Sequence, residues 1–240
     1  MITKGEIKEI RSLAQKKFRD GAGLFVVEGE KLVAEALASG FEVVKLFRTE
    51  EIGEENMARI SLLTHPSPAL AVVRKPSDTE IVPSADELIL ALDSLRDPGN
   101  VGTILRIADW FGIRTVLASP DTVEIYNPKV VQATMGAIFR VRVKVCPLPE
   151  TLVSLRRQGV PVYGTFLHGE SLYDAPLAQA GVIVLGSERD GISPEVEAAV
   201  TQRLTIPPYP AGQPSCAESL NVATAAAVVC GEFRRRTLTP

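Results

Sequence analysis

The sequence predicts an α/β protein whose larger part is a mostly parallel sheet with helices on both faces. From residue 88 onward, short apolar runs alternate with segments of helical spacing, as in parallel sheets that are buried on both faces. Before that point, the stretch from Lys75 to Glu87 is polar, carries prolines and has no periodicity, which is typical of a linker. We therefore expect a small α/β domain at 1–75, a linker at 76–87 and a larger domain at 88–240.

The small domain begins with helical spacing over residues 2–17, where Ile7, Ile10 and Leu13 fall on one face. Apolar runs and short periodic segments follow. They predict strands at 24–27, 41–49 and 69–75, and helices at 30–39 and 57–63.

The larger domain opens with an apolar strand at 88–93, followed by Asp97 and Pro98. Asp is a favoured N-cap and Pro a favoured first helical residue, so a helix is expected to begin here. Its buried stripe would contain Val101, Ile104 and Leu105. Further strands are expected at 114–119, 141–145, 160–166, 181–186 and 204–206, and further helices at 128–139, 151–158, 194–201 and 219–235.

Composition excludes several classes of protein. With 240 residues, of which 45% are hydrophobic, the chain can bury a sizeable core. No apolar run is long enough to span a membrane, and the N-terminus has no apolar signal region, so a cytoplasmic protein is expected. Three cysteines without a CxxC pair, and only two histidines, argue against a disulfide framework and against a metal site.

The net charge of −3 does not indicate a nucleic-acid-binding protein, but the cations gather at the two ends of the chain. One group lies near the N-terminus and includes Lys16, Lys17 and Arg19; the other is Arg234–Arg236. A solvated helix face and a frayed tail explain these clusters, and so does contact with phosphates. The sequence leaves both interpretations open.

Polar residues follow three of the apolar strands, at the edge where ligands bind to such sheets. Asn100 and Arg106 follow the first, Glu188 follows the run at 181–186, and Ser219 and Asn221 follow the run at 204–206. Neither a GxGxxG pattern nor a phosphate-binding loop is present, and no serine-hydrolase arrangement is found. These absences argue against a small-molecule enzyme of the dinucleotide or triphosphate type.

Each of these residues also has a purely structural explanation. Arg106 is placed to pair with Asp109 three residues later, or to bind a phosphate or alkoxide through its rigid fork of donors. Asn100 and Ser219 are both suitable helix caps, and Glu188 is a suitable turn residue. Spacing alone does not choose between these roles.

Taken together, three segments resemble the motifs of the SpoU (TrmH-type) branch of the SPOUT RNA methyltransferases. They are DPGNVGTILRIADWFGI at 97–113, VIVLGSERDGIS at 182–193 and LTIPPYPAGQPSCAESLNVATAAA at 204–227, and their order and spacing match the family. KKFRDGAGLFVVEGEKLVAEAL at 16–37 and LAVVRKP at 70–76 resemble the small L30e-like substrate-binding domain that is often fused to these enzymes. The resemblance covers nearly the whole chain.

The resemblance implies methyl transfer from S-adenosyl-L-methionine to a ribose 2′-hydroxyl of RNA, without a metal. It also implies a homodimer and a deep trefoil knot formed by the third motif and the last helix; knots are too rare for periodicity to predict. Carried over by motif, Asn100, Arg106, Glu188, Ser219 and Asn221 form the expected active-site set. The backbones of Gly186, Ile206 and Leu220 are expected to hold the cofactor. Lys16, Lys17, Arg19 and Arg140 are candidate contacts to RNA.

The L30e-like domain favours ribosomal RNA as the substrate, because it suits structured RNA that is recognised by shape. Two alternatives are a tRNA 2′-O-methyltransferase and a non-catalytic RNA-binding factor of ribosome assembly. An intact active-site set argues against the second. The role of Arg106 as a base or only as an electrostatic stabiliser is left open by the sequence. A guanidinium keeps its proton, so stabilisation of a developing alkoxide is the role that we expect.

Overall fold

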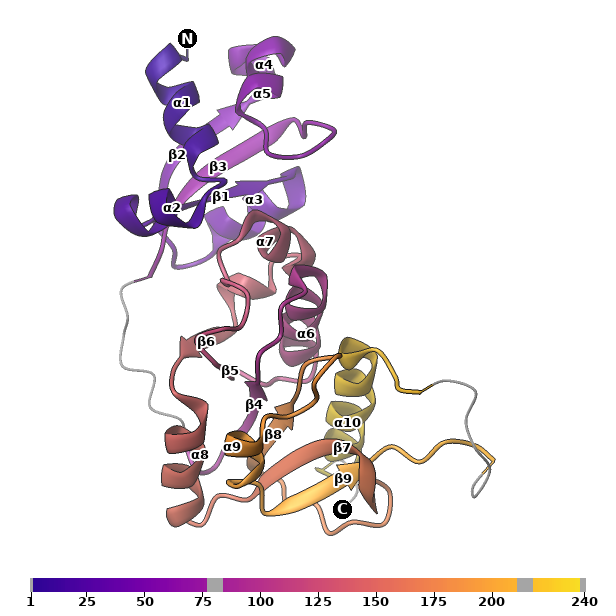
Figure 1. Cartoon of the computed structure of the whole chain (residues 1–240). Helices are drawn as coiled ribbons and strands as arrows, with labels where there is room; N and C mark the ends of the chain where they lie inside the picture. Colours follow the sequence, from indigo (N-terminus) through magenta and orange to yellow (C-terminus); the bar gives the residue numbers. More distant parts are fainter. Residues whose placement is uncertain (1, 77–83, 211–217, 238–240) are drawn as a thin grey trace. The chain divides into compact units, whose positions relative to one another are not determined.

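The computed structural model describes residues 2–76, 84–210 and 218–237. Contacts divide the chain into two compact units (Figure 1). The first contains residues 1–80 together with 124–140, and the second contains 81–123 and 141–240. The predicted domain boundaries at 75 and 88 stay a prediction, and most of the predicted linker lies outside the described residues.

The first unit is built on a three-stranded antiparallel sheet in the order β1-β3-β2 within the described residues. Helices pack on this sheet around a core that includes Ile10, Leu13, Met57 and Leu70. The strands are β1 (Leu24–Glu28), β2 (Val43–Arg48) and β3 (Ala69–Arg74). The helices are α1 (Lys4–Ser12), α2 (Lys16–Ala22), α3 (Glu30–Ala38), α4 (Thr49–Ile52), α5 (Glu54–Ile60), α7 (Pro128–Thr134) and the 3₁₀ turn η1 (Ala137–Phe139).

Two helices that were predicted as continuous in this unit are divided or end early. The single helix expected at 2–17 is two helices, α1 and α2, because the chain leaves helical geometry at Gln15. The helix expected at 128–139 ends at Thr134, because Met135 and Gly136 both have positive φ, 50° and 98°. A side chain at residue 136 would also lie within 3.0–3.3 Å of the Glu35 side chain, so glycine suits both the conformation and the space.

Residues 124–140 belong to the first unit although they come from the middle of the chain. Tyr126 packs on Phe25 of β1 with ring centroids 4.8 Å apart, and Phe139 meets Phe41 edge-on at 5.2 Å. Arg140 also forms an ion pair with Glu35. Aromatic pairs of this kind add to the free energy of simple area burial. The small sheet is therefore covered in part by a segment that is distant in sequence.

Arg19 is the most deeply buried cation of this unit among the described residues, with only 2% of its surface exposed. Its guanidinium donates to Glu124 Oε2 at 2.5 and 3.0 Å and to the carbonyl oxygens of Leu13 and Ala14 at 2.7 and 2.9 Å. Lys75 joins the same group, donating to Glu124 at 3.2 Å and to Asp20 at 2.7 Å. The hydrogen bond from Lys75 lowers the pKa of Asp20. A buried charge is tolerated only when it is paired in this way.

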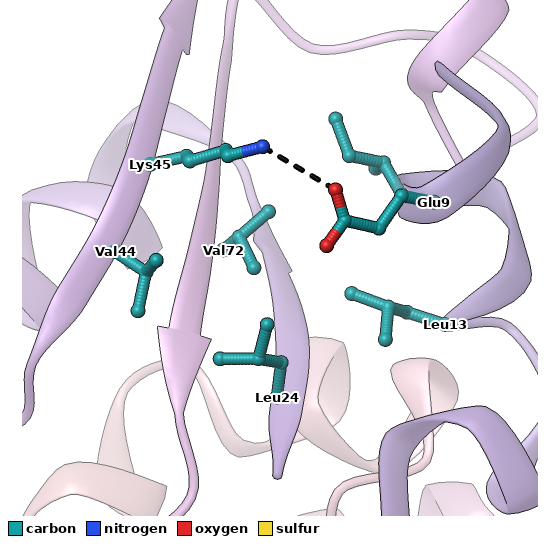
Figure 2. A pocket seen from close by; sticks show the side chains of 7 residues that line it. Glu9, Leu13, Leu24, Val44, Lys45 and Val72 are labelled. Carbon is teal, nitrogen blue, oxygen red and sulfur yellow. Dashed lines mark hydrogen bonds and ion pairs between the residues drawn. The ribbon is translucent and has the colours of Figure 1, made fainter. Parts of the chain in front are cut away.

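A small cavity of about 30 Å³ lies between α1 and the sheet of the first unit (Figure 2). Apolar side chains, among them Leu13, Leu24 and Val72, surround it, and the ion pair between Lys45 and Glu9, at 3.3 Å, closes one side. This volume is about that of one water molecule. The cavity is a packing gap and is too small for a nucleotide.

The described part of the second unit contains a six-stranded sheet in the order β6-β5-β4-β8-β7-β9, and every pairing in it is parallel. Helices α6 and α10 lie beside one another in this unit (Figure 1). The strands are β4 (Leu88–Leu92), β5 (Thr115–Ala118), β6 (Arg142–Val145), β7 (Val162–Ser171), β8 (Gly181–Leu185) and β9 (Gln202–Thr205). The helices are α6 (Pro98–Trp110), α8 (Leu148–Arg157), α9 (Pro194–Glu197) and α10 (Val222–Thr237).

This architecture confirms the predicted fold class, a mostly parallel α/β sheet preceded by a small α/β domain. The central strands β4 and β8 are buried along their whole length, which explains why their sequences are uninterrupted apolar runs. Several boundaries differ, among them three: β7 continues to Ser171, α9 ends at Glu197, and α10 begins at Val222 rather than at residue 219. The knot stays a prediction.

The buried ion pair between Arg19 and Glu124 yields a prediction for stability. Glu124→Gln should lower the unfolding free energy of the first unit by about 3 kcal/mol, because it leaves a buried guanidinium without its counter-charge. Urea titration measures this difference. Glu42→Gln is the matched control, since Glu42 pairs with Arg74 in the same unit at the surface and should cost far less, because exposed ion pairs contribute little. Equal effects of the two variants would contradict the structural role of the buried pair.

Candidate active site

The start of α6 is organised as the sequence predicts. Asp97 accepts a hydrogen bond from the backbone N–H of Asn100 at 2.7 Å, and Pro98 occupies the first helical turn. Because Asp97 caps the helix, the side chain of Asn100 is not needed for that role. It is therefore available to contact other elements.

The segment after β8 forms a tight hairpin. Ser187 and Gly191 exchange two backbone hydrogen bonds, both 3.0 Å long, and Gly191 has a φ of 71°. Gly186 precedes this turn, and a Cβ atom on it would lie 2.2–2.5 Å from the backbone of Gly191 and Ile192. Only glycine fits there. The hairpin presents Glu188 at an exposed position.

A chain of side-chain hydrogen bonds connects the three polar segments. Asn100 Nδ2 donates to Glu188 Oε1, and Asn221 Nδ2 donates to Asn100 Oδ1 at 3.0 Å. Asn221 Oδ1 in turn accepts from the backbone N–H groups of Ala223 and Thr224 at 3.0 and 3.2 Å. Asn221 accepts from the helix and donates to Asn100, and Asn100 donates to the carboxylate, so the bonds polarise one another in one direction.

Asn221, rather than Ser219, is therefore the N-cap of α10, which corrects one of the two roles considered for Ser219. Ser219 lies two residues before the cap, is exposed, and its hydroxyl makes no hydrogen bond to another described residue. Arg106 is also exposed, roughly 9 Å along α6 from Asn100. No hydrogen bond or ion pair joins Arg106 to the rest of the described chain. The structure thus brings Asn100, Glu188 and Asn221 together, but not Arg106 or Ser219.

A second connection fixes the other ends of the same two helices. Arg234, near the end of α10, donates through Nε to the carbonyl of Phe111 at 2.7 Å and through Nη2 to that of Gly112 at 3.3 Å. Gly231 packs against the Phe111 ring, and Ala226 is fully buried, so small residues let the helices approach. Helices α6 and α10 are therefore parallel and bonded at both ends.

The three expected cofactor residues lie at the carboxyl edge of the sheet or just before α10. Gly186 follows β8 and Ile206 follows β9, while Leu220, which is 50% exposed, immediately precedes the cap Asn221. Among the described residues, the backbone groups of Ile206 and Leu220 make no hydrogen bond to other backbone groups. Free backbone donors and acceptors beside an exposed apolar side chain are suited to binding an adenosine.

Sequence reasoning missed the second half of β7. After Thr165 the strand shifts register against β9 and continues to Ser171, with residues 167–170 exposed. Gly169 allows this course, because a Cβ atom there would lie 2.7 Å from the carbonyl oxygen of Arg203. Since β7 lies between β8 and β9, this extension rises at the same edge as Gly186 and Ile206. The signal available in the sequence was Gly169, a glycine within a polar stretch that continues an apolar strand.

A family model described as the SpoU rRNA Methylase family matches residues 87–231, more than half of the chain. The chain belongs to the SpoU rRNA methylase family. A second model, described as the MRM3-like substrate binding domain, matches residues 4–80. The resemblance seen in the sequence is thereby confirmed for both parts of the chain.

Relatives and solved structures extend this likeness over nearly the full length. The 23S rRNA (guanosine(2553)-2′-O)-methyltransferase RlmP of Bacillus subtilis (strain 168) is 30% identical, over 95% of this chain and 96% of the relative. A structure from Porphyromonas gingivalis, assigned to the TrmH family of RNA methyltransferases, is 44% identical with a TM-score of 0.89, covering 98% of this chain and 99% of that one. An AdoMet-bound rRNA methyltransferase from Sinorhizobium meliloti is 29% identical with a TM-score of 0.86, covering 100% and 97%.

Among the candidate RNA contacts in this SpoU family member, the prediction for Arg19 must be corrected. Its guanidinium is buried and bonded to Glu124, so its role is to hold α2 in place. Lys16 and Lys17 are exposed on the same helix and stay candidates. Arg140 is paired with Glu35 but remains 45% exposed, so it also stays a candidate.

The C-terminal arginines of this family member are not a frayed tail; Arg234 and Arg236 bond to backbone carbonyls, and Arg235 is largely exposed beside Glu232. Arg236 donates to Glu232 and to the carbonyl oxygens of Leu172, Tyr173 and Ala175 at 2.5–2.9 Å, which anchors the segment after β7. Arg235 also donates to Glu232, at 2.7 and 2.9 Å.

Within residues 2–76, 84–210 and 218–237, no group of three or more His, Cys, Asp or Glu side chains is placed to hold a metal ion. No helix of that part of the chain is long and apolar enough to cross a membrane.

The Glu232 carboxylate yields a prediction for the pH dependence of stability. Hydrogen bonds from Arg235 and then Arg236 lower the pKa of Glu232 from 4.5 to about 2. Its stabilisation is therefore complete above about pH 4.5 and is lost as the pH falls toward 2. Glu232→Gln should cost about 1 kcal/mol at neutral pH and flatten the stability profile between these values, as measured by urea unfolding. Glu195→Gln, at an exposed position on α9, is the control and should leave the profile unchanged.

Proposed function

We propose that this chain is a methyltransferase that transfers the methyl group of S-adenosyl-L-methionine to a ribose 2′-hydroxyl of ribosomal RNA. The observation that carries the proposal is the bonded chain Glu188–Asn100–Asn221, which unites residues of all three family motifs at one edge of the sheet. Membership of the SpoU family and the named activity of the B. subtilis relative, a 23S rRNA 2′-O-methyltransferase, support the choice of reaction and substrate.

The backbones of Gly186, Ile206 and Leu220 are proposed to hold S-adenosylmethionine, with no metal taking part. When bound, it supplies an electrophilic methyl group on a positively charged sulfur. In the transfer, the bond between the ribose 2′-oxygen and the methyl carbon forms as the sulfur–methyl bond breaks, and the hydroxyl proton is released. The paired backbone hydrogen bonds of the 186–191 hairpin favour this role, because precise alignment of the reacting atoms supplies much of the rate.

Arg106 is proposed to orient the ribose and to stabilise the 2′-oxygen as it gains negative charge. A guanidinium remains protonated and offers a planar fork of donors to an alkoxide and a neighbouring phosphate. Its exposure on α6 leaves the side chain accessible to RNA. Glu188, Asn100 and Asn221 would shape the site beside it, and Ser219 would complete the set.

A homodimer whose RNA site draws residues from both copies is part of the proposal. Trp110, at the end of α6, is 84% exposed, and burial in a second copy would remove this apolar surface from water. A partner would also explain why Arg106 and Ser219 lie apart from the bonded chain within one described copy. The trefoil knot belongs to the same proposal.

The cofactor is tested by calorimetric titration with S-adenosylmethionine and S-adenosylhomocysteine. Saturable binding of either is expected with the purified protein. Transfer is then measured with radiolabelled cofactor on ribosomal RNA and on tRNA. A 2′-O-methyl group blocks alkaline cleavage of the next phosphodiester, so label that survives in an alkali-stable dinucleotide identifies the ribose as acceptor. Label on tRNA alone, or binding without transfer to either RNA, would contradict the proposal.

Arg106 gives a sharper test of the mechanism. Arg106→Ala should lower kcat for methyl transfer by at least about 100-fold, as expected for the loss of one electrostatic stabiliser of a developing oxyanion. The dissociation constant for S-adenosylmethionine should stay within about threefold. Arg157→Ala, which removes an exposed guanidinium from α8, is the control and should be as active as the wild type. Equal activity of Arg106→Ala and the control would refute the assignment.

A further inference from the structure

Asp93 is a carboxylate with 3% exposure at the end of β4, and no role has yet been given to it. Its backbone N–H donates to the carbonyl of Leu185 at 2.9 Å, which continues the pairing of β4 with β8 beyond the last residues of both strands. Asp93 therefore lies at the carboxyl edge of the sheet, just before the first family motif and beside the strand that begins the second. A buried carboxylate must have hydrogen-bond partners to be tolerated there.

Its two oxygens accept hydrogen bonds from two segments, the second family motif and the residues that follow β4. Oδ2 accepts from the backbone N–H of Ser193 at 2.7 Å, and Oδ1 accepts from the Ser94 hydroxyl at 3.1 Å. Ser94 has a φ of 60°, a conformation that a non-glycine residue adopts only when its surroundings impose it. The backbone N–H of Ser94 donates to the Ser119 hydroxyl at 2.9 Å, which helps to impose this conformation.

The hairpin that carries Glu188 has few other attachments. Ser187 and Gly191 bond to one another, and the Ser187 hydroxyl accepts from the N–H of Asp190 at 3.0 Å, so these bonds hold the turn together without placing it. Outside the hairpin, Asn100 donates to Glu188 on one side; on the other, Ser193 donates to Asp93 and accepts from the backbone N–H of Glu197 at 2.8 Å. Among these bonds, only the one to Asp93 has a buried carboxylate as its acceptor. Hydrogen bonds to a buried carboxylate are stronger than neutral ones.

We infer that Asp93 is a positioning residue for methyl transfer, which fixes the 186–193 hairpin to the end of β4 and thereby places Gly186 and Glu188. The inference rests on the proposed function for its catalytic meaning, but not for its structural content. Asp93 acts through the backbone of Ser193 and takes no part in the chemistry. Without it, the hairpin would open more often, which breaks its internal bonds and exposes the Ser187 and Gly191 amides, and its place relative to Asn100 would vary.

Three variants distinguish loss of the hydrogen bond between Ser193 and Asp93 from a general loss of folding. Asp93→Ala removes the acceptor, and Asp93→Asn restores an oxygen that can accept from Ser193. Ser193→Pro deletes the N–H donor and leaves the carboxylate intact; Ser193 has a φ of −64° and a ψ of 150°, which proline adopts before a following proline. Glu87→Ala is the matched control, because Glu87 immediately precedes β4, at the strand end opposite Asp93, and accepts from the Thr115 hydroxyl at 2.9 Å, not from the hairpin.

The first readout uses the cofactor-free protein. Hydrogen–deuterium exchange at the Ser187 and Gly191 amides should be at least about 10-fold faster in Asp93→Ala and in Ser193→Pro than in the wild type, the size expected for loss of a charged hydrogen bond. Exchange in Asp93→Asn and Glu87→Ala should stay within about threefold. Unchanged exchange in a folded Asp93→Ala variant would overturn the inference, whatever the protein's activity. If that variant does not fold, Ser193→Pro decides by the same criterion.

The second readout is the dissociation constant for S-adenosylmethionine, measured by calorimetry. It should rise at least about 10-fold in Asp93→Ala and in Ser193→Pro, and combining the two changes should add little, because both remove the same bond. Additive effects would contradict the inference. If the wild type bound no cofactor, the proposed function would fail while the exchange experiment still tested the placement of the hairpin.

Discussion

The site depends on one constraint, which is that α6 and α10 are parallel and bonded at both ends. At one end Asn221 caps α10 and donates to Asn100; at the other Arg234 donates to the carbonyl oxygens of Phe111 and Gly112. Because Arg234 fixes the far ends of the two helices, the side-chain amides of Asn100 and Asn221 are held close enough to bond. The polar residues are thereby held before any ligand binds, which is the condition for electrostatic stabilisation without reorganisation.

Much of this fold was predictable, because its signals are local. The capped start of α6 and the apolar runs of β4 and β8 follow from turn chemistry and burial. The break of the helix after Thr134 was not predicted, since a positive φ at Met135 reflects tertiary packing. The residues of the site were named by motif, but the identity of the α10 cap and the bond from Asn100 to Glu188 required three-dimensional structure.

Arg19 shows why residue type alone misleads in such a search. A cation within a basic segment suggests a surface that contacts RNA, yet its guanidinium is buried against Glu124, 105 positions along the chain. Neither burial nor a distant partner can be deduced from local composition. The C-terminal arginines illustrate the same point, since their donors bind protein carbonyls and one carboxylate.

The membership of residues 124–140 in the first unit has a consequence for how such proteins can diversify. The chain passes between the two units three times, after residues 80, 123 and 140. A substrate-recognition domain with that connectivity is not a portable module that recombination could exchange by a single cut in the linker. Exchange of residues 1–80 alone would separate Tyr126 from Phe25 and Glu124 from Arg19. Residues 1–80 and 124–140 must therefore evolve together.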